Sequence, residues 1–117
     1  MTIAPMVVRI DDLSHPGGKL LLSKLDEHAD NAAALLALLA NGKRLTIVEH
    51  LLEHEMSVGA IAEKVDLSQS ALSQHLAKLR SMNLVETRRD RQMIYYSCKS
   101  PSVRRLLETL EEIFGKR

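Results

Sequence analysis

The sequence predicts a mainly α-helical domain with one small β-hairpin before its last helix. Aliphatic residues recur at helical spacing along most of the chain, and cap or turn residues divide these segments at short intervals. Two β-prone runs follow one another shortly before the C-terminal segment. The chain has 117 residues, 45% of them hydrophobic, which is the size of one domain and argues against disorder throughout.

The N-terminal part divides into an arm and the start of the domain. Residues 1–18 contain prolines and glycines and show no sustained period, so we expect an arm there and one domain over residues 19–117. From Lys19 to Ala40 the sequence is rich in leucine and alanine, which predicts helix in one or two pieces. Asn41-Gly42 is expected to stop this helix, because glycine tolerates the left-handed conformation.

Two shorter helices are predicted next. The first runs from about Lys43 to Glu53, and the second begins at Ser57, which is a good N-cap. Helical spacing predicts that the first helix buries Leu45, Val48 and Leu52, with Ile47 and Leu51 on its flank. The second helix is expected to bury Val58, Ile61, Ala62 and Val65.

The fourth predicted helix follows a tight turn at Asp66-Leu67. Ser68 caps it, and it runs to about Ser81, where Asn83 can end it in the left-handed conformation. A short helix, a turn and a longer helix form a helix–turn–helix.

A hairpin and a last helix complete the pattern. Leu84–Arg89 and Met93–Cys98 are β-prone runs that the turn Asp90-Arg91-Gln92 separates. Ser100-Pro101 supplies a cap and a proline in the first turn of the last helix. The whole order, four helices, two strands and a fifth helix, predicts a winged helix–turn–helix.

The polar face of the fourth helix carries candidates for base recognition. Leu72, Leu76 and Leu79 fall on one stripe that must face the core. The opposite face has small or amide side chains and no acid, which suits the major groove, where glutamine can bond adenine through two hydrogen bonds. The alternative is a solvated helix whose polar side has no partner. The predicted base-reading residues are Gln69, Ser70, Ser73 and Gln74.

Positive charge is concentrated in one short segment. The net charge is +1, but residues 78–99 hold six Lys or Arg against two acidic residues, whereas residues 1–77 hold six against ten. This pattern is typical of a surface that binds a polyanion, although a solvated hairpin would show the same charges. The predicted phosphate-contacting residues are Ser68, Lys78 and Arg80 on the helix, and Arg88, Arg89 and Arg91 on the wing.

One long stretch resembles the ArsR/SmtB family of winged-helix transcriptional repressors: SVGAIAEKVDLSQSALSQHLAKLRSMNLVETRRDRQMIYYS, from Ser57 to Ser97. The preceding NGKRLTIVEHLLEHEMSV is also similar to the family, and LSQSALSQHLAKLR is its most specific segment. Within the family the chain most resembles the NolR-like branch, which includes redox-linked regulators. The resemblance implies a homodimer, held by the first and last helices, that binds a pseudo-palindromic operator and blocks transcription.

The apolar pattern supports a homodimer independently. The stripe on the last helix is too wide for a terminal helix that covers so small a core, and an exposed apolar stripe normally marks an interface. The alternative is that this helix only caps its own core. The predicted interface residues are Leu35, Leu36, Leu39, Leu106, Leu107, Leu110, Ile113 and Phe114.

The metal-sensing and redox-sensing sites that the resemblance to this family implies are absent from the sequence. Glu55–Ala60 lacks the two thiolates of one metal-sensing type, and residues 101–117 lack the histidines of another. The redox branch has cysteines at two positions that correspond here to Glu49 and Gly115. No metal, cofactor or small-molecule ligand is therefore predicted.

A histidine pair and the single cysteine could still bind a metal or respond to oxidation, although they do not match the sensing sites of the family. His50 and His54 are spaced i,i+4, which suits zinc, although such a pair is more often solvated. Cys98 follows the second strand, where alternation places it in the core, and a buried lone thiol is usually inert.

Other classes of function have less support. The sequence contains no nucleophile elbow, glycine-rich phosphate loop or evident carboxylate pair, so we do not expect an enzyme. No apolar run approaches the roughly 20 residues of a membrane span, and one cysteine fits a reducing cytoplasm. The sequence predicts a cytoplasmic transcriptional regulator that binds double-stranded DNA and acts as a repressor. An adaptor or anti-activator that lost DNA binding, and a sensor with a non-standard metal or redox site, stay open as alternatives.

Overall fold

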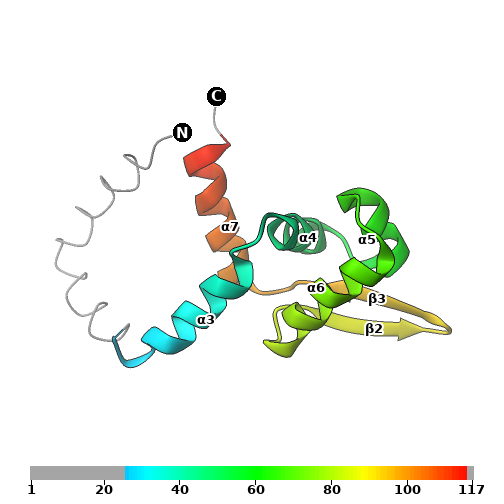
Figure 1. Ribbon diagram of the computed structural model, residues 1–117, viewed down its shortest axis with the longest axis horizontal. Coiled ribbons are helices and arrows are strands. Elements are labelled where there is room, and N and C mark those ends of the chain that lie inside the picture. The colour runs from blue at the N-terminus through cyan, green and yellow to red at the C-terminus, as the bar shows by residue number, and fades with distance from the viewer. Residues whose placement is uncertain (1–25, 116–117) are drawn as a thin grey trace.

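The computed structural model describes residues 26–115, so the expected arm over residues 1–18 lies outside the described residues. α3 and α7 come close where α3 ends and α7 begins and then diverge, and the hairpin projects away from both helices (Figure 1). The described elements are α3 (Ala29–Leu39), α4 (Gly42–Glu53), β1 (Met56–Ser57), α5 (Val58–Val65), α6 (Gln69–Ser81), β2 (Glu86–Asp90), β3 (Met93–Ser97) and α7 (Pro101–Phe114).

Side-chain caps fix where three of the predicted helices begin. The hydroxyls of Ser57, Ser68 and Ser100 each accept a hydrogen bond from the main-chain N–H three residues later, at 3.1–3.3 Å. Asn83 has a φ of 61°, so the prediction of a left-handed residue after α6 is confirmed. Asp66 is also left-handed, with a φ of 57°, and ends α5.

The expected glycine stop after α3 is wrong. Gly42 is the first residue of α4, and none of the described glycines has a positive φ. Asn41 is instead an N-cap in extended conformation, whose side chain accepts a hydrogen bond from the amide of Arg44 at 3.1 Å. The break between the helices therefore depends on the start of α4 and needs no left-handed residue.

The predicted hairpin is part of a sheet of three strands in the order β1-β3-β2. β1 was not expected: Met56 pairs with Tyr96 and Ser57 with Tyr95. β2 begins at Glu86, two residues later than predicted, because Leu84 and Val85 are buried and lead the chain out of α6. Arg91 takes a φ of 62° in the turn between β2 and β3.

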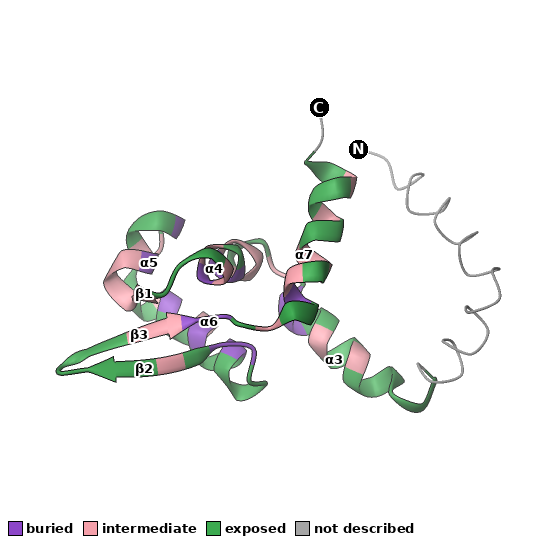
Figure 2. Cartoon of the chain, turned by 180° about the vertical axis from the view of Figure 1, so that it is seen from behind, coloured by how far each residue is buried: buried purple, intermediate pink, exposed green. Residues whose placement is uncertain are grey.

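The core lies between α4, α5, α6 and the start of α7, as the buried positions in Figure 2 show. The predicted leucine stripe of α6 is confirmed, because Leu72, Leu76 and Leu79 are at most 1% exposed. In α4 the prediction is confirmed for Val48, which is buried, but it is wrong for the rest of the face: Ile47 and Leu51 are buried, whereas Leu45 and Leu52 are only half-buried. These two leucines turn towards α7 and line a groove that it borders. In α5, Ile61 and Val65 are buried, while Val58 and Ala62 are half-buried.

Polar contacts also join α7 and β3 to α4. The Arg104 guanidinium donates one hydrogen bond to the Leu52 carbonyl at 2.6 Å and another to the Glu53 carboxylate at 3.1 Å. The amide of Cys98 donates to the carbonyl of Leu51 at 3.1 Å. No helix among residues 26–115 is long and apolar enough to span a bilayer.

Candidate nucleic-acid interface

α6 presents its polar face to solvent as the second helix of the helix–turn–helix. Gln69, Ser70, Ser73 and Gln74 are all exposed, so the predicted base-reading side chains share one accessible surface. The buried leucines on the other side of α6 fix its rotation, because turning them outward would expose apolar area. The helix therefore presents its polar face, including these four residues, to a partner.

The first turn of α6 contains a hydroxyl with two local contacts. Ser68 Oγ accepts the cap hydrogen bond from the Ala71 amide at 3.2 Å and lies 3.3 Å from Ser70 Oγ. The cap uses only an acceptor site of this hydroxyl, so the Ser68 O–H and the unpaired main-chain N–H groups of the first turn can still donate to an anion.

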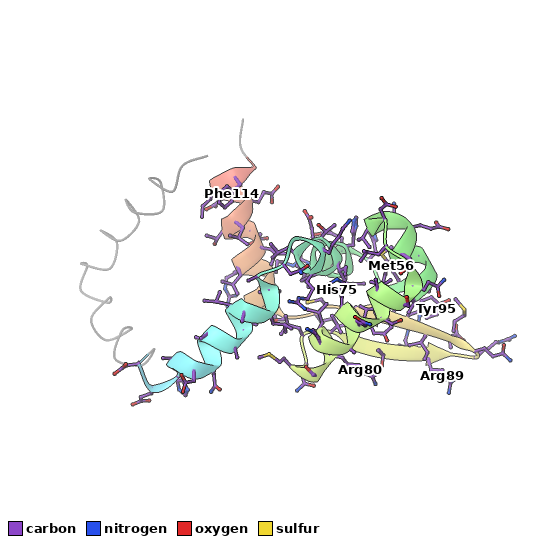
Figure 3. The ribbon with its side chains drawn as sticks, viewed as in Figure 1. Met56, His75, Arg80, Arg89, Tyr95 and Phe114 are labelled. Carbon is purple, nitrogen blue, oxygen red and sulfur yellow. The ribbon has the colours of Figure 1, made fainter. Side chains whose placement is uncertain are left out.

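The basic side chains predicted to contact phosphate come from α6 and from the wing. Lys78, Arg80, Arg89 and Arg91 are exposed and have no acidic partner among residues 26–115. Arg89 pairs with Ile94 across the hairpin, one position beyond the Arg88–Tyr95 pair. Successive strand residues point to opposite faces, and in Figure 3 Arg89 and Tyr95 lie on opposite sides of the hairpin.

Arg88 differs from the other wing arginines, because its guanidinium is already bonded. It donates from Nε to Glu55 Oε2 at 3.0 Å and from Nη2 to Glu55 Oε1 at 2.7 Å. Its guanidinium carbon also lies 4.9 Å from the centre of the Tyr95 ring. This pair lowers the pKa of Glu55 and raises that of Arg88. Sequence reasoning missed Glu55, since nothing in the sequence links positions 33 residues apart.

His75 lies at the edge of the apolar stripe of α6 and is half-buried. Its pKa is lowered, first by burial and then by the positive charges of Arg44 and Lys78. The Arg44 Nε atom is buried without a hydrogen-bond partner among the described residues. The prediction of a structural histidine fits this setting, because a neutral imidazole is favoured there.

The predicted dimer-interface residues fall into two groups. Leu36 and Phe114 are 58% and 54% exposed, and Leu35, Leu106, Leu107, Leu110 and Ile113 are half-buried. Leu39 differs from them, because it is 6% exposed and belongs to the core of its own chain. A groove of about 460 Å³ lies between α4 and α7. Its lining includes the apolar side chains of Leu45, Leu52, Leu107, Leu110 and Phe114 and the charged side chains of Glu49, Glu53, Arg104, Glu108 and Glu111.

Residues 41–87 match the family model described as "Bacterial regulatory protein, arsR family". The chain is 57% identical over 89 residues to the nodulation protein NolR of Rhizobium meliloti, covering 76% of this chain and 73% of that protein. The chain belongs to the ArsR family. It is therefore a DNA-binding transcriptional regulator, and its family is one of regulators rather than of enzymes.

Solved structures support the same assignment to the ArsR family. The crystal structure of NolR from Sinorhizobium fredii has a TM-score of 0.74 at 56% identity, over 80% of this chain and 94% of that one. A winged helix–turn–helix DNA-binding domain from Mycobacterium bovis, described as homodimeric, has a TM-score of 0.67 at 32% identity, over 76% of this chain and 82% of that one. The predicted winged helix–turn–helix is confirmed.

The structure also bears on the two sensor-like features of this ArsR-family chain. Within residues 26–115 no group of three or more His, Cys, Asp or Glu residues is arranged to hold a metal ion, and His54 is the C-cap of α4 rather than a helical partner of His50. Cys98 is buried at 3% exposure, as predicted, and burial raises the pKa of its thiol.

Proposed function

We propose that this ArsR-family regulator binds a pseudo-palindromic operator as a homodimer and represses transcription by occupying it. In this proposal α6 of each protomer enters the major groove of one half-site, and the β2–β3 wing lies along the adjacent backbone. The observation that carries the proposal is the face of α6 with exposed Ser and Gln side chains, no acid, and a buried leucine stripe behind it.

The proposed role of each polar residue of α6 in DNA binding follows from its position and the length of its side chain. Gln74 lies near the middle of the polar face, and its amide can make two hydrogen bonds to an adenine edge. Ser70 lies about one turn earlier, Ser73 directly precedes Gln74, and both are short enough to let the helix approach the bases closely. Gln69 is nearer the flank, where base and phosphate are both within reach.

The proposed backbone contacts come from side chains whose charge has no internal partner. Lys78, Arg80, Arg89 and Arg91 meet this condition within the described part of the chain. Contacts of this kind set position and affinity without reading sequence. They account for the concentration of positive charge between residues 78 and 99.

The proposed dimer is supported by apolar surface that one chain leaves uncovered. Leu36 on α3 and Phe114 on α7 are more than half exposed, and both helices lie on the side of the molecule away from the tip of the wing (Figure 1). A second copy that covers both helices would remove this surface from water. It would also present two α6 helices with two-fold symmetry, which matches successive half-sites about 34–36 Å apart.

Footprinting on the DNA upstream of the gene itself tests the proposal. We expect protection of two half-sites related by two-fold symmetry and separated by one helical turn. Binding to every duplex alike would contradict the operator, and a single protected half-site would contradict the dimer. If the protein binds no duplex, the proposal fails and the alternative of an adaptor without DNA binding is favoured.

A further inference from the structure

The contact between Arg88 and Glu55 has the geometry of a fixed joint rather than of a loose surface pair. Two parallel hydrogen bonds, at 3.0 Å and 2.7 Å, join both edges of the carboxylate to one side of the guanidinium. Such a fork sets the plane of the arginine as well as its distance. The Arg88 side chain is 53% exposed, so the joint lies at the surface of the protein.

Tyr95 adds a third segment to this joint. The Arg88 guanidinium carbon lies 4.9 Å from the centre of its ring, and Tyr95 is the residue opposite Arg88 in the β2–β3 ladder. On its other side Tyr95 pairs with Ser57, the N-cap of α5. The joint therefore connects β2 and β3 of the wing with the chain segment that begins the helix–turn–helix.

The Arg88–Glu55 joint lies at the point where β1 stops supporting the hairpin. β1 pairs with β3 only at Tyr95 and Tyr96, so beyond Tyr95 the wing is a two-stranded ribbon. Arg89 and Arg91, the arginines proposed to contact phosphate, lie in that unsupported part. Two-stranded ribbons twist readily, and their direction depends on what holds their base.

We infer that Arg88 is a positioning residue, which through Glu55 and Tyr95 sets the direction of the wing and contacts no phosphate itself. The inference deepens the proposed function and rests on it. The charge of Arg88 is matched by Glu55, whereas those of Arg89 and Arg91 have no acidic partner among residues 26–115. The three wing arginines therefore divide into one that orients and two that bind.

Conservative variants separate this role from a direct contact, because lysine keeps the charge but loses the fork. We expect Arg88→Lys and Glu55→Gln each to weaken binding to the upstream DNA by about two- to fivefold, the range of one well-formed surface pair. The matched control Arg105→Lys, at an exposed arginine of α7, should bind as the wild type does. Because both changes break one joint, the double variant should lose no more than either single variant.

A phosphate contact at Arg88 predicts opposite results. Arg88→Lys would bind like the wild type, and Glu55→Gln would bind more tightly, since it frees the arginine and removes a negative charge. Either outcome in a variant with an unchanged melting temperature would overturn the inference.

Amide hydrogen exchange in the protein without DNA gives a second measurement. We expect Glu55→Gln to speed exchange in β2 and β3 near the turn but not in α6. Unchanged exchange there would contradict the positioning role. A wild-type protein that bound no duplex would refute the proposed function, while the exchange data would still decide whether Arg88 holds the wing.

Discussion

The main-chain amide of Cys98 donates a hydrogen bond of 3.1 Å to the carbonyl oxygen of Leu51, which ties the end of β3 to α4. This contact turns the Cys98 side chain into the core, where it is 3% exposed. The base of the wing is thereby joined to the central helix of the fold, and the single thiol of the chain is enclosed by the same arrangement.

We predict that the Cys98 thiol is unreactive in the folded protein. Burial raises its pKa, so little thiolate forms at neutral pH, and the core blocks access. Modification by a disulfide reagent should be slower than in denaturant by about tenfold or more. Rapid modification of the folded protein, with a change in DNA affinity, would make Cys98 a redox sensor and contradict this account.

A pH effect on stability is predicted from His75. Its pKa is lowered in the folded state, by burial first and then by Arg44 and Lys78. When the pH falls through the ordinary histidine range near 6.5, the unfolded chain takes up a proton that the folded chain does not, so stability decreases. Urea unfolding at several pH values between 5 and 8 should show this loss. His75→Gln should flatten the curve, whereas the control His28→Gln, at an exposed site, should leave it unchanged.

The dimer is predicted to depend on the apolar face of α7. Leu110→Glu places a charge in the proposed interface without a compensating partner, so light scattering should give the mass of one chain, 13.1 kDa. Leu107→Glu should act in the same way, with an added loss of stability, because Leu107 also packs against the core. The control Thr109→Glu, at an exposed position of the same helix, should remain dimeric. Folded dimers in both leucine variants would refute the proposed interface.

Salt dependence is predicted to identify the arginines that bind the backbone. Loss of one phosphate contact lowers the slope of log affinity against log salt by about one unit. We expect this decrease for Arg89→Ala and for Arg91→Asn, equally on all sequences; asparagine is chosen because residue 91 has a φ of 62°. Arg105→Ala, at an exposed arginine on α7, serves as the control. An unchanged slope in a wing variant would remove that arginine from the interface.

Local signals in the sequence were enough to predict the order of the helices and of the two wing strands. The serines that cap α5, α6 and α7 act through residues only three positions away, and the leucines of α6 repeat within one helix. Such short-range interactions can be inferred from spacing alone. The polar face of α6 could be predicted for the same reason.

Features that depend on distant partners could not be predicted. β1 has two residues, too few for an alternating pattern, and it exists because Met56 and Ser57 pair with residues of β3. The facing of α4 was wrong because leucines and isoleucine surround much of that helix, and only the position of α7 decides that Leu45 and Leu52 line a groove. The partner of Arg88 lies 33 residues away, so its hydrogen bonds to Glu55 could not be inferred from the sequence.

Base reading by α6 can be measured through the affinity of Gln74→Ala for the operator and for a scrambled duplex at one salt concentration. Losing the two hydrogen bonds of one amide should cost about 1–3 kcal/mol per half-site on the operator and nothing on the scrambled duplex. Gln92→Ala, which removes an exposed amide from the wing turn, is the matched control and should leave operator specificity intact. If Gln74→Ala weakens binding to both duplexes equally, or to neither, α6 does not recognise the operator through this residue.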